Sequence, residues 1–212
     1  MTIFSKPAVQ AFVDQAHKRS YAPKHTLMLA GDPPQSIYLI LEGSVSILLE
    51  DENGREIVLA YLNTGDFFGE LCLFPDQQAR TAIVRTRTPT LAAELDYDAF
   101  MKFYRQNPDI MFEIAGQLAS RLRDTTRRLA DLAFLDVTGR MARTLLDLTK
   151  KRESIANPRG TMIRTSRQEL ARLVGCSREM AGRVLKKLEE DGIVATQGRS
   201  ILVLGVSKPS TD

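Results

Sequence analysis

The spacing of hydrophobic and polar residues changes twice along this chain. Between Ser5 and Ser20, apolar side chains recur at helical spacing and predict a short amphipathic helix, at Val9, Phe12, Val13 and Ala16. From Tyr21 to about Leu95, short apolar runs alternate with turn residues, which is typical of β-strands. After Pro108 the apolar positions return to helical spacing over one long segment. We therefore expect an α+β protein.

The strand-rich segment has the pattern of an antiparallel roll. In SIYLILEG, period-two alternation predicts a strand, at Ile37, Leu39 and Leu41. Asn53-Gly54 separates the apolar runs VSILLE and IVLAYL and is a strong hairpin signal. Glycines punctuate the segment at positions 31, 43, 54, 65 and 69. A compact antiparallel roll or barrel is expected from this pattern.

The long helical segment carries a heptad seam. Its positions follow one another at alternating steps of four and three residues: Met111, Ala115, Leu118, Leu122, Thr125, Leu129 and Leu132. One chain could bury this stripe against its own roll, but so straight a seam favours a partner helix and a parallel homodimer. Thr125 is a polar position in this seam, with Thr126 beside it. A polar residue in such a seam usually fixes the register of the paired helices, but it can also bind a ligand. Phe134–Gly139 interrupts the helix and Asp136 can cap the next one, so a hinge is expected at 134–138.

Residues 167–188 combine two amphipathic segments around a glycine. The first has an apolar face, at Leu170, Leu173 and Val174, and Ala171 is small where two helices must cross closely. Gly175 supplies the turn, and Ser177 can cap a second helix whose inner face is Ala181, Val184, Leu185 and Leu188. This order predicts a helix-turn-helix. GIVATQGRSILVLG follows, and its two short strands around a glycine turn make the motif a winged one.

The second helix of this motif carries side chains that can recognise nucleic acid. Arg178, Glu179 and Arg183 lie near its start and on its outer side; arginine can bond guanine twice and glutamate can accept from cytosine. Other side chains suit phosphate contacts: Ser166, Arg167, Gln168, Ser177 and Lys186. The alternative is a helical hairpin with charged solvent faces.

The charge distribution favours nucleic acid. The net charge is +3, but residues 1–138 carry 14 basic and 18 acidic side chains, whereas residues 139–212 carry 15 and 8. A basic C-terminal third indicates a module that faces a polyanion, although uneven solvated surface is an alternative.

Composition excludes several classes. With 43% hydrophobic and 26% charged residues, the chain is in the globular range. No apolar run approaches about 18 residues and no secretory signal is visible, so we expect no membrane association. Cys72 and Cys176 lie far apart, which fits a reduced cytoplasmic protein without a metal site. With histidine only at His17 and His25, no hydrolytic triad or metal-ligand pair can be assembled, and no enzyme is expected.

A second motif, GDFFGELCLFPDQQARTA, combines groups that could bind a nucleotide. Gly69 permits close backbone approach, while Glu70 offers acceptors for a sugar hydroxyl. Arg80 and Thr81 supply a bidentate cation and a hydroxyl for a phosphodiester. The alternative is a structural Glu70–Arg80 salt bridge that braces a loop. The chemistry of the motif alone slightly favours this alternative, because a single Gly-Glu/Arg-Thr arrangement is weakly specific.

In this order, GELCLF…ARTA, LAFLDVTGR and SRQELARLVGCSREMAGRVLKKLEEDGIV resemble the bacterial cyclic AMP receptor protein (catabolite activator protein) family, from about residue 20 to 205. The resemblance implies an N-terminal antiparallel β-roll of the cyclic-nucleotide-binding type (1–107), a long dimerisation helix (108–135) and a C-terminal winged helix-turn-helix DNA-binding domain (136–212). It implies a homodimeric transcription regulator that is activated allosterically by cyclic AMP. Its partners would be a two-fold-symmetric site in double-stranded DNA and RNA polymerase.

The resemblance also assigns residues. The ligand-binding positions are Gly69, Glu70, Leu71, Arg80, Thr81, Thr125 and Thr126. Among them, Gly69 and Glu70 would approach the ribose, and Arg80 and Thr81 would hold the cyclic phosphate. Thr125 would meet the base from its own subunit and Thr126 from the partner. Base reading would fall to Arg178, Glu179 and Arg183.

Two departures from the family pattern leave alternatives open. Thr81 stands where the receptor has serine and Cys72 where it has glycine. Cyclic GMP is therefore a possible ligand, and we expect Cys72 to pack in the roll. The regulator could also be independent of cyclic AMP or respond to a cyclic dinucleotide; remoter alternatives are a nucleotide-processing enzyme and a scaffold. Neither iron–sulfur nor haem sensing is expected, because no cysteine precedes Cys72 and both histidines precede the roll.

Overall fold

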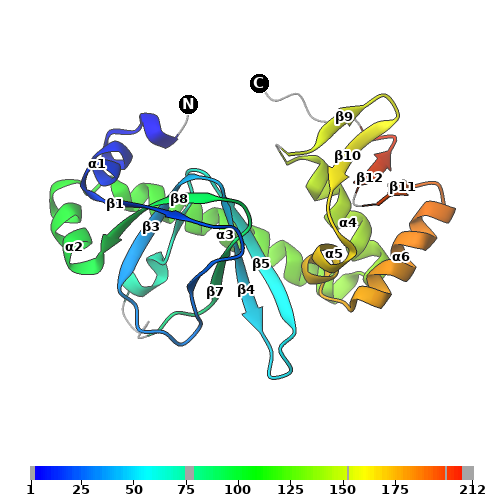
Figure 1. The fold of residues 1–212 in the computed structure, drawn as a ribbon, viewed down its shortest axis with the longest axis horizontal. Coiled ribbons are helices and arrows are strands. Elements are labelled where there is room, and N and C mark those ends of the chain that lie inside the picture. Colours follow the sequence, from blue (N-terminus) through cyan, green and yellow to red (C-terminus); the bar gives the residue numbers. More distant parts are fainter. Residues whose placement is uncertain (1–2, 75–78, 152, 199, 207–212) are drawn as a thin grey trace. The chain divides into compact units, whose positions relative to one another are not determined.

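The computed structural model describes residues 3–74, 79–151, 153–198 and 200–206. The chain divides into two compact units, Met1–Thr125 and Thr126–Asp212, drawn in Figure 1. The division falls inside one continuous helix, α3 (Ile110–Phe134). The domain boundaries expected at residues 107 and 135 stay predictions.

The first unit is built on antiparallel strands. Among the described residues they form two sheets, with the strand orders β1-β8-β3-β6 and β2-β7-β4-β5. Their bounds are β1 His17–Tyr21, β2 Thr26–Met28, β3 Ser36–Glu42, β4 Ser44–Glu50, β5 Glu56–Asn63, β6 Phe67–Phe68, β7 Ile83–Thr86 and β8 Thr90–Asp96. Side chains of both sheets meet in one core, in which Tyr38 and Phe68 of the first pack with Val45 and Leu62 of the second. The predicted α+β class with an antiparallel roll is confirmed. The expectation that both histidines precede the roll is wrong, because His17 begins β1 and His25 lies between β1 and β2.

Strand β3 is buried on both faces. Ile37 and Leu39, identified by their alternation, pack beneath the helices, while Tyr38 and Ile40 fill the interior between the sheets. The period-two pattern therefore marked only one of two buried faces. A strand covered by helices on one side and by a second sheet on the other has no solvent-facing row.

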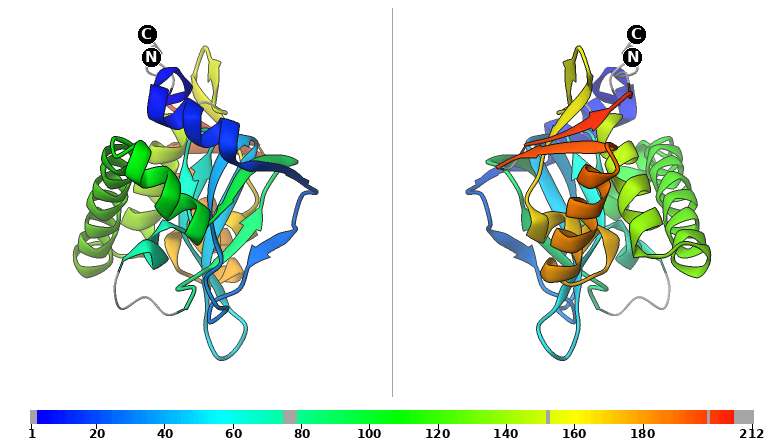
Figure 2. Two further views of the ribbon diagram at one scale, coloured as in Figure 1. Left: turned by 90° about the vertical axis from the view of Figure 1, so that its left-hand side faces the viewer. Right: turned by 90° about the vertical axis from the view of Figure 1, so that its right-hand side faces the viewer.

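Helices α1 and α2 and the start of α3 cover the outer face of the roll. The predicted N-terminal helix is α1 (Pro7–Gln15), preceded by a short 3-10 turn (Ile3–Ser5), and its Val9, Phe12 and Val13 are buried as expected. Helix α2 (Tyr97–Gln106), which the sequence pattern did not reveal, begins at Asp96, whose side chain accepts from the Ala99 amide at 2.8 Å. Phe12 contacts the rings of Phe100 and Phe103, and Figure 2 shows α1 and α2 on the same side of the roll.

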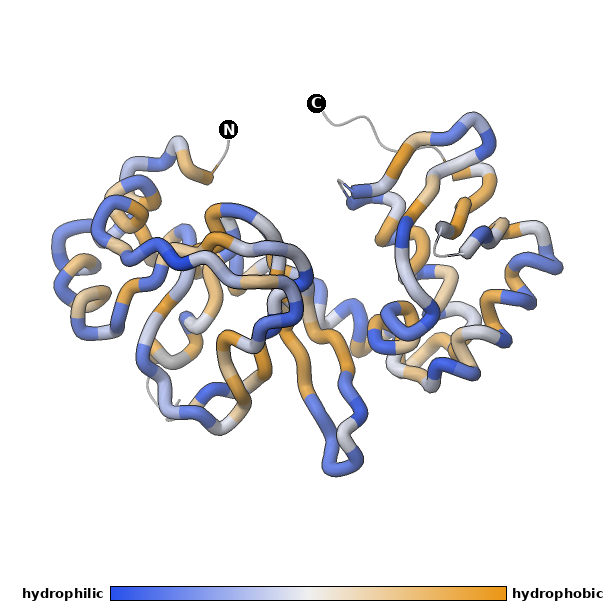
Figure 3. The backbone as a smooth tube through the Cα atoms, viewed as in Figure 1, coloured by the Kyte–Doolittle hydropathy of each residue, from blue (hydrophilic) through white to orange (hydrophobic). Residues whose placement is uncertain are grey.

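The predicted hairpin at Asn53-Gly54 joins β4 and β5. The Asp51 carboxylate accepts from the amides of Asn53 and Arg55, both at 2.9 Å, and Gly54 has a φ of +74°. The hairpin extends beyond the other strands of the roll (Figure 1). In Figure 3 its tip is hydrophilic and its strands are hydrophobic.

The second unit contains the predicted winged helix-turn-helix. Asp136 caps α4 (Val137–Thr149) as expected, accepting from the Gly139 amide at 2.8 Å. Helices α5 (Arg167–Val174) and α6 (Arg178–Glu190) follow. An antiparallel sheet completes the unit, in the order β11-β12-β10-β9: β9 Ile155–Asn157, β10 Gly160–Arg164, β11 Val194–Gln197 and β12 Ser200–Leu204. The wing strands β11 and β12 were predicted; β9 and β10 were not.

Helix α3 presents two neighbouring stripes. Ile110 and Ile114 are buried in the core of the roll. The heptad seam lies one residue further on, and its later leucines are exposed: Leu122 by 68%, Leu129 by 66% and Leu132 by 51%. Within the first unit, the roll packs against the stripe beside the seam and leaves Leu122 exposed, and Leu129 and Leu132 of the second unit are exposed as well. No helix among the described residues is both long and apolar enough to cross a membrane.

Candidate functional site

A glycine lets the backbone of the roll come close to a buried arginine. Gly69 follows β6 with a φ of +82° and precedes a 3-10 turn, η2 (Glu70–Leu73). A Cβ at Gly69 would lie 2.8 Å from Arg80 Nη1 and 2.9 Å from the Ser36 carbonyl oxygen. Any larger residue would therefore be strained and would clash. The structure shows this close approach to Arg80 and Ser36, and the approach of Gly69 to a ligand stays a prediction.

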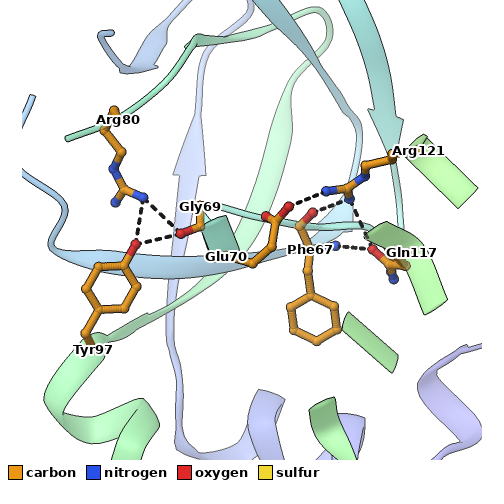
Figure 4. Close-up of polar contacts among 8 residues, drawn as sticks. Phe67, Gly69, Glu70, Arg80, Tyr97, Gln117 and Arg121 are labelled. Carbon is orange, nitrogen blue, oxygen red and sulfur yellow. Dashed lines mark hydrogen bonds and ion pairs between the residues drawn. The ribbon is translucent and has the colours of Figure 1, made fainter. Parts of the chain in front are cut away.

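Arg80 is 7% exposed, and its guanidinium donates to neutral acceptors (Figure 4). Nη1 donates to the Gly69 carbonyl at 3.1 Å and to the Tyr97 hydroxyl at 2.9 Å, and Nη2 donates to the Ser36 carbonyl at 2.8 Å. Tyr97 in turn donates to the Gly69 carbonyl at 2.6 Å. A guanidinium has five N–H donors, so Nε and part of Nη2 stay available for an anion within the described structure.

Glu70 is buried and pairs with a residue of α3. Its Oε1 lies 2.8 Å from Arg121 Nη1, and the residue is 4% exposed. Burial raises the pKa of Glu70 above its ordinary value, and the Arg121 charge opposes this. The Glu70–Arg80 salt bridge offered as an alternative is wrong, because Arg121 is the ion-pair partner and Arg80 binds neutral oxygens.

Arg121 belongs to a polar network that joins α3 to the roll. Its Nη2 donates to the Phe67 carbonyl and to Gln117 Oε1. Gln117 also donates to the Gly65 carbonyl at 2.9 Å and accepts from the Phe67 amide at 2.8 Å. Sequence reasoning missed Gln117, Arg121 and Tyr97. The signal for the first two was a second stripe at four- and three-residue steps, one residue before the heptad seam: Ile110, Ile114, Gln117 and Arg121.

The remaining ligand candidates are exposed. Leu71 is 42% exposed, Thr81 is exposed beside Arg80, and Thr125 and Thr126 are exposed on α3. Thr125 follows Arg121 by four residues and so shares its side of the helix. The structure thus brings Gly69, Glu70 and Arg80 into one polar cluster. The prediction that Cys72 packs in the roll falls outside the side chains that the structure describes.

In the second unit, serine side chains cap the N-termini of both helices of the helix-turn-helix. Ser166 Oγ accepts from the Glu169 amide and Ser177 Oγ from the Met180 amide, both at 3.1 Å. Gly175 ends α5 with a φ of +72°. The predicted inner face of α6 is buried, whereas Leu173 of α5 is only half-buried. Ser166 acts as an acceptor in its cap, so its O–H can still donate to a phosphate. The Ser177 hydroxyl also bonds the Glu179 side chain.

The outer face of α6 forms a groove with the wing. Charged side chains of both signs line it together with Thr196 of β11: Arg167, Arg178, Glu179, Arg183, Lys186 and Glu189. Gln168 is exposed on α5. Hydrogen bonds from its own amide and from Ser177 lower the pKa of Glu179, so this side chain is ionised and can accept from a base.

Family models match both units. A cyclic nucleotide-binding domain matches residues 18–107, and a Crp-like helix-turn-helix domain matches residues 139–208. These ranges contain the polar cluster around Arg80 and the groove along α6.

Known regulators are similar over almost the whole chain. The cAMP-activated global transcriptional regulator Vfr of Pseudomonas aeruginosa is 49% identical, over 89% of this chain and 90% of that protein. The cAMP-activated regulator CRP of Pasteurella multocida is 43% identical, over 94% and 95%. A solved structure of Clp, described as a c-di-GMP-responsive global regulator of Xanthomonas campestris, is 45% identical with a TM-score of 0.89, over 94% of this chain and 99% of that one.

Proposed function

The chain belongs to the cyclic AMP receptor protein family of DNA-binding transcription regulators, and from this premise we propose that it is a homodimer activated allosterically by cyclic AMP. It is a regulator and not an enzyme. The observation that carries the ligand proposal is Arg80, a buried cation whose hydrogen-bond acceptors among the described residues are neutral oxygens. The Glu70 charge acts on it only without an ion pair, because Glu70 is paired with Arg121. A buried charge in that state favours an anionic ligand.

In the proposed complex the cyclic phosphate binds the remaining Arg80 donors and the exposed hydroxyl of Thr81. Gly69 and Glu70 approach the ribose, Leu71 borders the sugar, and Glu70 accepts from a ribose hydroxyl. Thr125 contacts the base from the same subunit and Thr126 from the partner. The exposed leucines of the seam support this dimer, because pairing two copies along α3 would cover them.

Cyclic AMP is favoured over a cyclic dinucleotide by the two relatives described as cAMP-activated. The second candidate ligand is c-di-GMP, which is supported by the similarity to Clp. Titration calorimetry with cyclic AMP, cyclic GMP and c-di-GMP separates the candidates. We expect cyclic AMP to bind most tightly; binding of c-di-GMP alone would support the second candidate.

The Arg121–Glu70 ion pair can couple nucleotide binding in the roll to helix α3. A ligand that bonds Glu70 changes the partner of Arg121, and Arg121 lies on the same helix as the seam. We propose that the liganded dimer favours an arrangement in which two α6 helices enter successive major grooves about 34 Å apart, the family's geometry. A ligand shifts this equilibrium only as far as it binds that arrangement more tightly. The segments 1–107, 108–135 and 136–212, with a hinge at 134–138, and RNA polymerase as a partner belong to the same proposal.

The raised pKa of Glu70 predicts a pH-dependent nucleotide affinity. A hydroxyl donated to the carboxylate favours the ionised form, so binding lowers this pKa. Nucleotide affinity should therefore be full above the raised pKa of Glu70 and should fall as the pH decreases through that pKa. The fall should occur at a higher pH than for an exposed glutamate, whose pKa is about 4.3. The cations of Arg121 and Arg80 face this group. Calorimetry at a series of pH values around the raised pKa should show this fall in nucleotide affinity. The Glu70→Gln variant should bind nucleotide weakly at every pH, without the fall. A Glu70→Gln affinity equal to that of the unchanged protein would contradict the ribose contact.

Arg183 is expected to read a base. Arg183→Ala should weaken DNA binding by about 1–3 kcal/mol and relax base preference at one position of each half-site. Binding to a library of sites with single substitutions measures both effects. Lys186→Ala, proposed to lose a phosphate contact, is the matched control and should weaken all sites alike and reduce the salt slope by about 1. Uniform weakening by Arg183→Ala would mean that Arg183 contacts phosphate.

A further inference from the structure

Glu189 stands where a carboxylate is unfavourable for two reasons. It lies in the last turn of α6, where the negative end of the helix dipole opposes an acidic side chain. It also lines the same groove as Arg178, Arg183 and Lys186, where DNA phosphates would come close. A free carboxylate at this position would weaken both the helix and DNA binding.

The carboxylate is held by the first strand of the wing. Glu189 Oε1 accepts from the Thr196 backbone amide at 2.7 Å and from the Thr196 hydroxyl at 3.0 Å, and Oε2 lies 3.0 Å from the same hydroxyl. The contact spans the turn between α6 and β11, which Gly192 allows with a φ of +69° and in which the Ile193 amide donates to the Leu188 carbonyl at 2.9 Å. Charge-assisted bonds of this kind are stronger and more directional than neutral ones.

We propose that Glu189 is a positioning residue for DNA binding, which holds Thr196 and so sets the separation between the wing and α6. The groove is lined by side chains of α6, by Arg167 of α5 and by Thr196 of the wing, so a DNA strand in the groove would contact both α6 and the wing. The wing can then contribute phosphate contacts only while this separation is kept. The inference rests on the proposed role of α6 in reading bases.

Substitutions at Glu189 separate positioning from charge. Removing an acid from a DNA-facing groove strengthens binding through charge alone. Glu190 is the matched control, because it is exposed, lies next in the chain and has only a 3.7 Å ion pair with Lys186. Glu190→Gln should therefore tighten DNA binding by about twofold. Glu189→Ala should weaken it by about tenfold, whereas Glu189→Gln, which keeps an acceptor oxygen, should bind at least as tightly as the unchanged protein.

The salt dependence gives the second readout. If the wing loses its position in Glu189→Ala, fewer phosphates are contacted and the slope of log affinity against log salt becomes shallower. Tighter binding by Glu189→Ala, equal to that of Glu190→Gln, would overturn the proposal.

Substitutions at Thr196 test the same contact if the Glu189→Ala variant fails to fold. Thr196→Val loses only the hydroxyl bonds and should weaken DNA binding by about threefold, while Thr196→Ser should restore it. Thermal unfolding and nucleotide calorimetry check that each variant is folded, and equal affinity of the valine and serine variants would also overturn the proposal. Arg183→Ala serves as the reference: no effect there refutes base reading by α6, whereas normal binding by Glu189→Ala alone refutes only this inference.

Discussion

Replacing Arg80 with alanine is expected to abolish nucleotide-stimulated DNA binding. The substitution removes the buried cation proposed to bind the cyclic phosphate, and losing one partner of a buried charged pair costs about 2–5 kcal/mol. Nucleotide affinity should therefore fall by at least about 30-fold, as titration calorimetry measures. DNA binding without nucleotide should stay at its basal level, since Arg80 and the α6 groove lie in different units.

Two further variants distinguish the loss of a phosphate contact from a folding defect. Arg80→Ala removes the Arg80 donor from the Ser36 carbonyl and leaves the Gly69 carbonyl bonded to Tyr97. Arg80→Lys, which keeps the charge but loses the forked geometry, should show an intermediate loss. Arg87→Ala removes an exposed guanidinium from the same unit, where it lies 3.8 Å above the Tyr61 ring, and should leave nucleotide affinity unchanged. Nucleotide binding by Arg80→Ala as tight as that of the unchanged protein would refute the site.

Leu129→Glu is expected to break the proposed dimer. A two-fold seam would bury this carboxylate from both copies without a partner, and each uncompensated buried charge costs about 3–5 kcal/mol. The dimer dissociation constant should rise by at least about 100-fold, which analytical ultracentrifugation measures. Affinity for a two-fold-symmetric DNA site should fall with it, because a single subunit reaches only one half-site.

Leu146→Glu is the control for this prediction. Leu146 is also a partly exposed leucine, at 42%, but it lies on α4 and outside the seam. The Leu146→Glu variant should therefore stay dimeric. A Leu129→Glu protein that sediments like the unchanged one would show that the α3 seam is not the dimer interface.

Local signals predicted those elements that depend on neighbouring residues. The Asp136 and Ser177 caps, the Gly175 turn and the Asn53-Gly54 hairpin each need only a few consecutive side chains. Features set by tertiary packing were missed. Helix α2 has only a short apolar pattern, at Phe100 and Phe103, and the second buried face of β3 exists because another sheet packs against it.

The candidate site divides in the same way. Glycine and charge spacing pointed to Gly69, Glu70 and Arg80, which the structure brings together. The ion-pair partner of Glu70 could not be read from spacing, because Arg121 lies 51 residues away and meets it only through the packing of α3 on the roll. The Glu189–Thr196 contact is similar: seven residues separate the two, but only the fold of the wing makes them neighbours.

The most direct test of cyclic AMP activation is the affinity for a two-fold-symmetric DNA duplex, measured by fluorescence anisotropy at one fixed salt concentration. Titrations with cyclic AMP, cyclic GMP and c-di-GMP should be compared in the same buffer, because phosphate contacts make absolute affinities depend on salt. We predict that saturating cyclic AMP tightens DNA binding by about 5–150-fold and that the other two nucleotides have smaller effects. DNA affinity that cyclic AMP leaves unchanged, or that only c-di-GMP alters, would contradict this account.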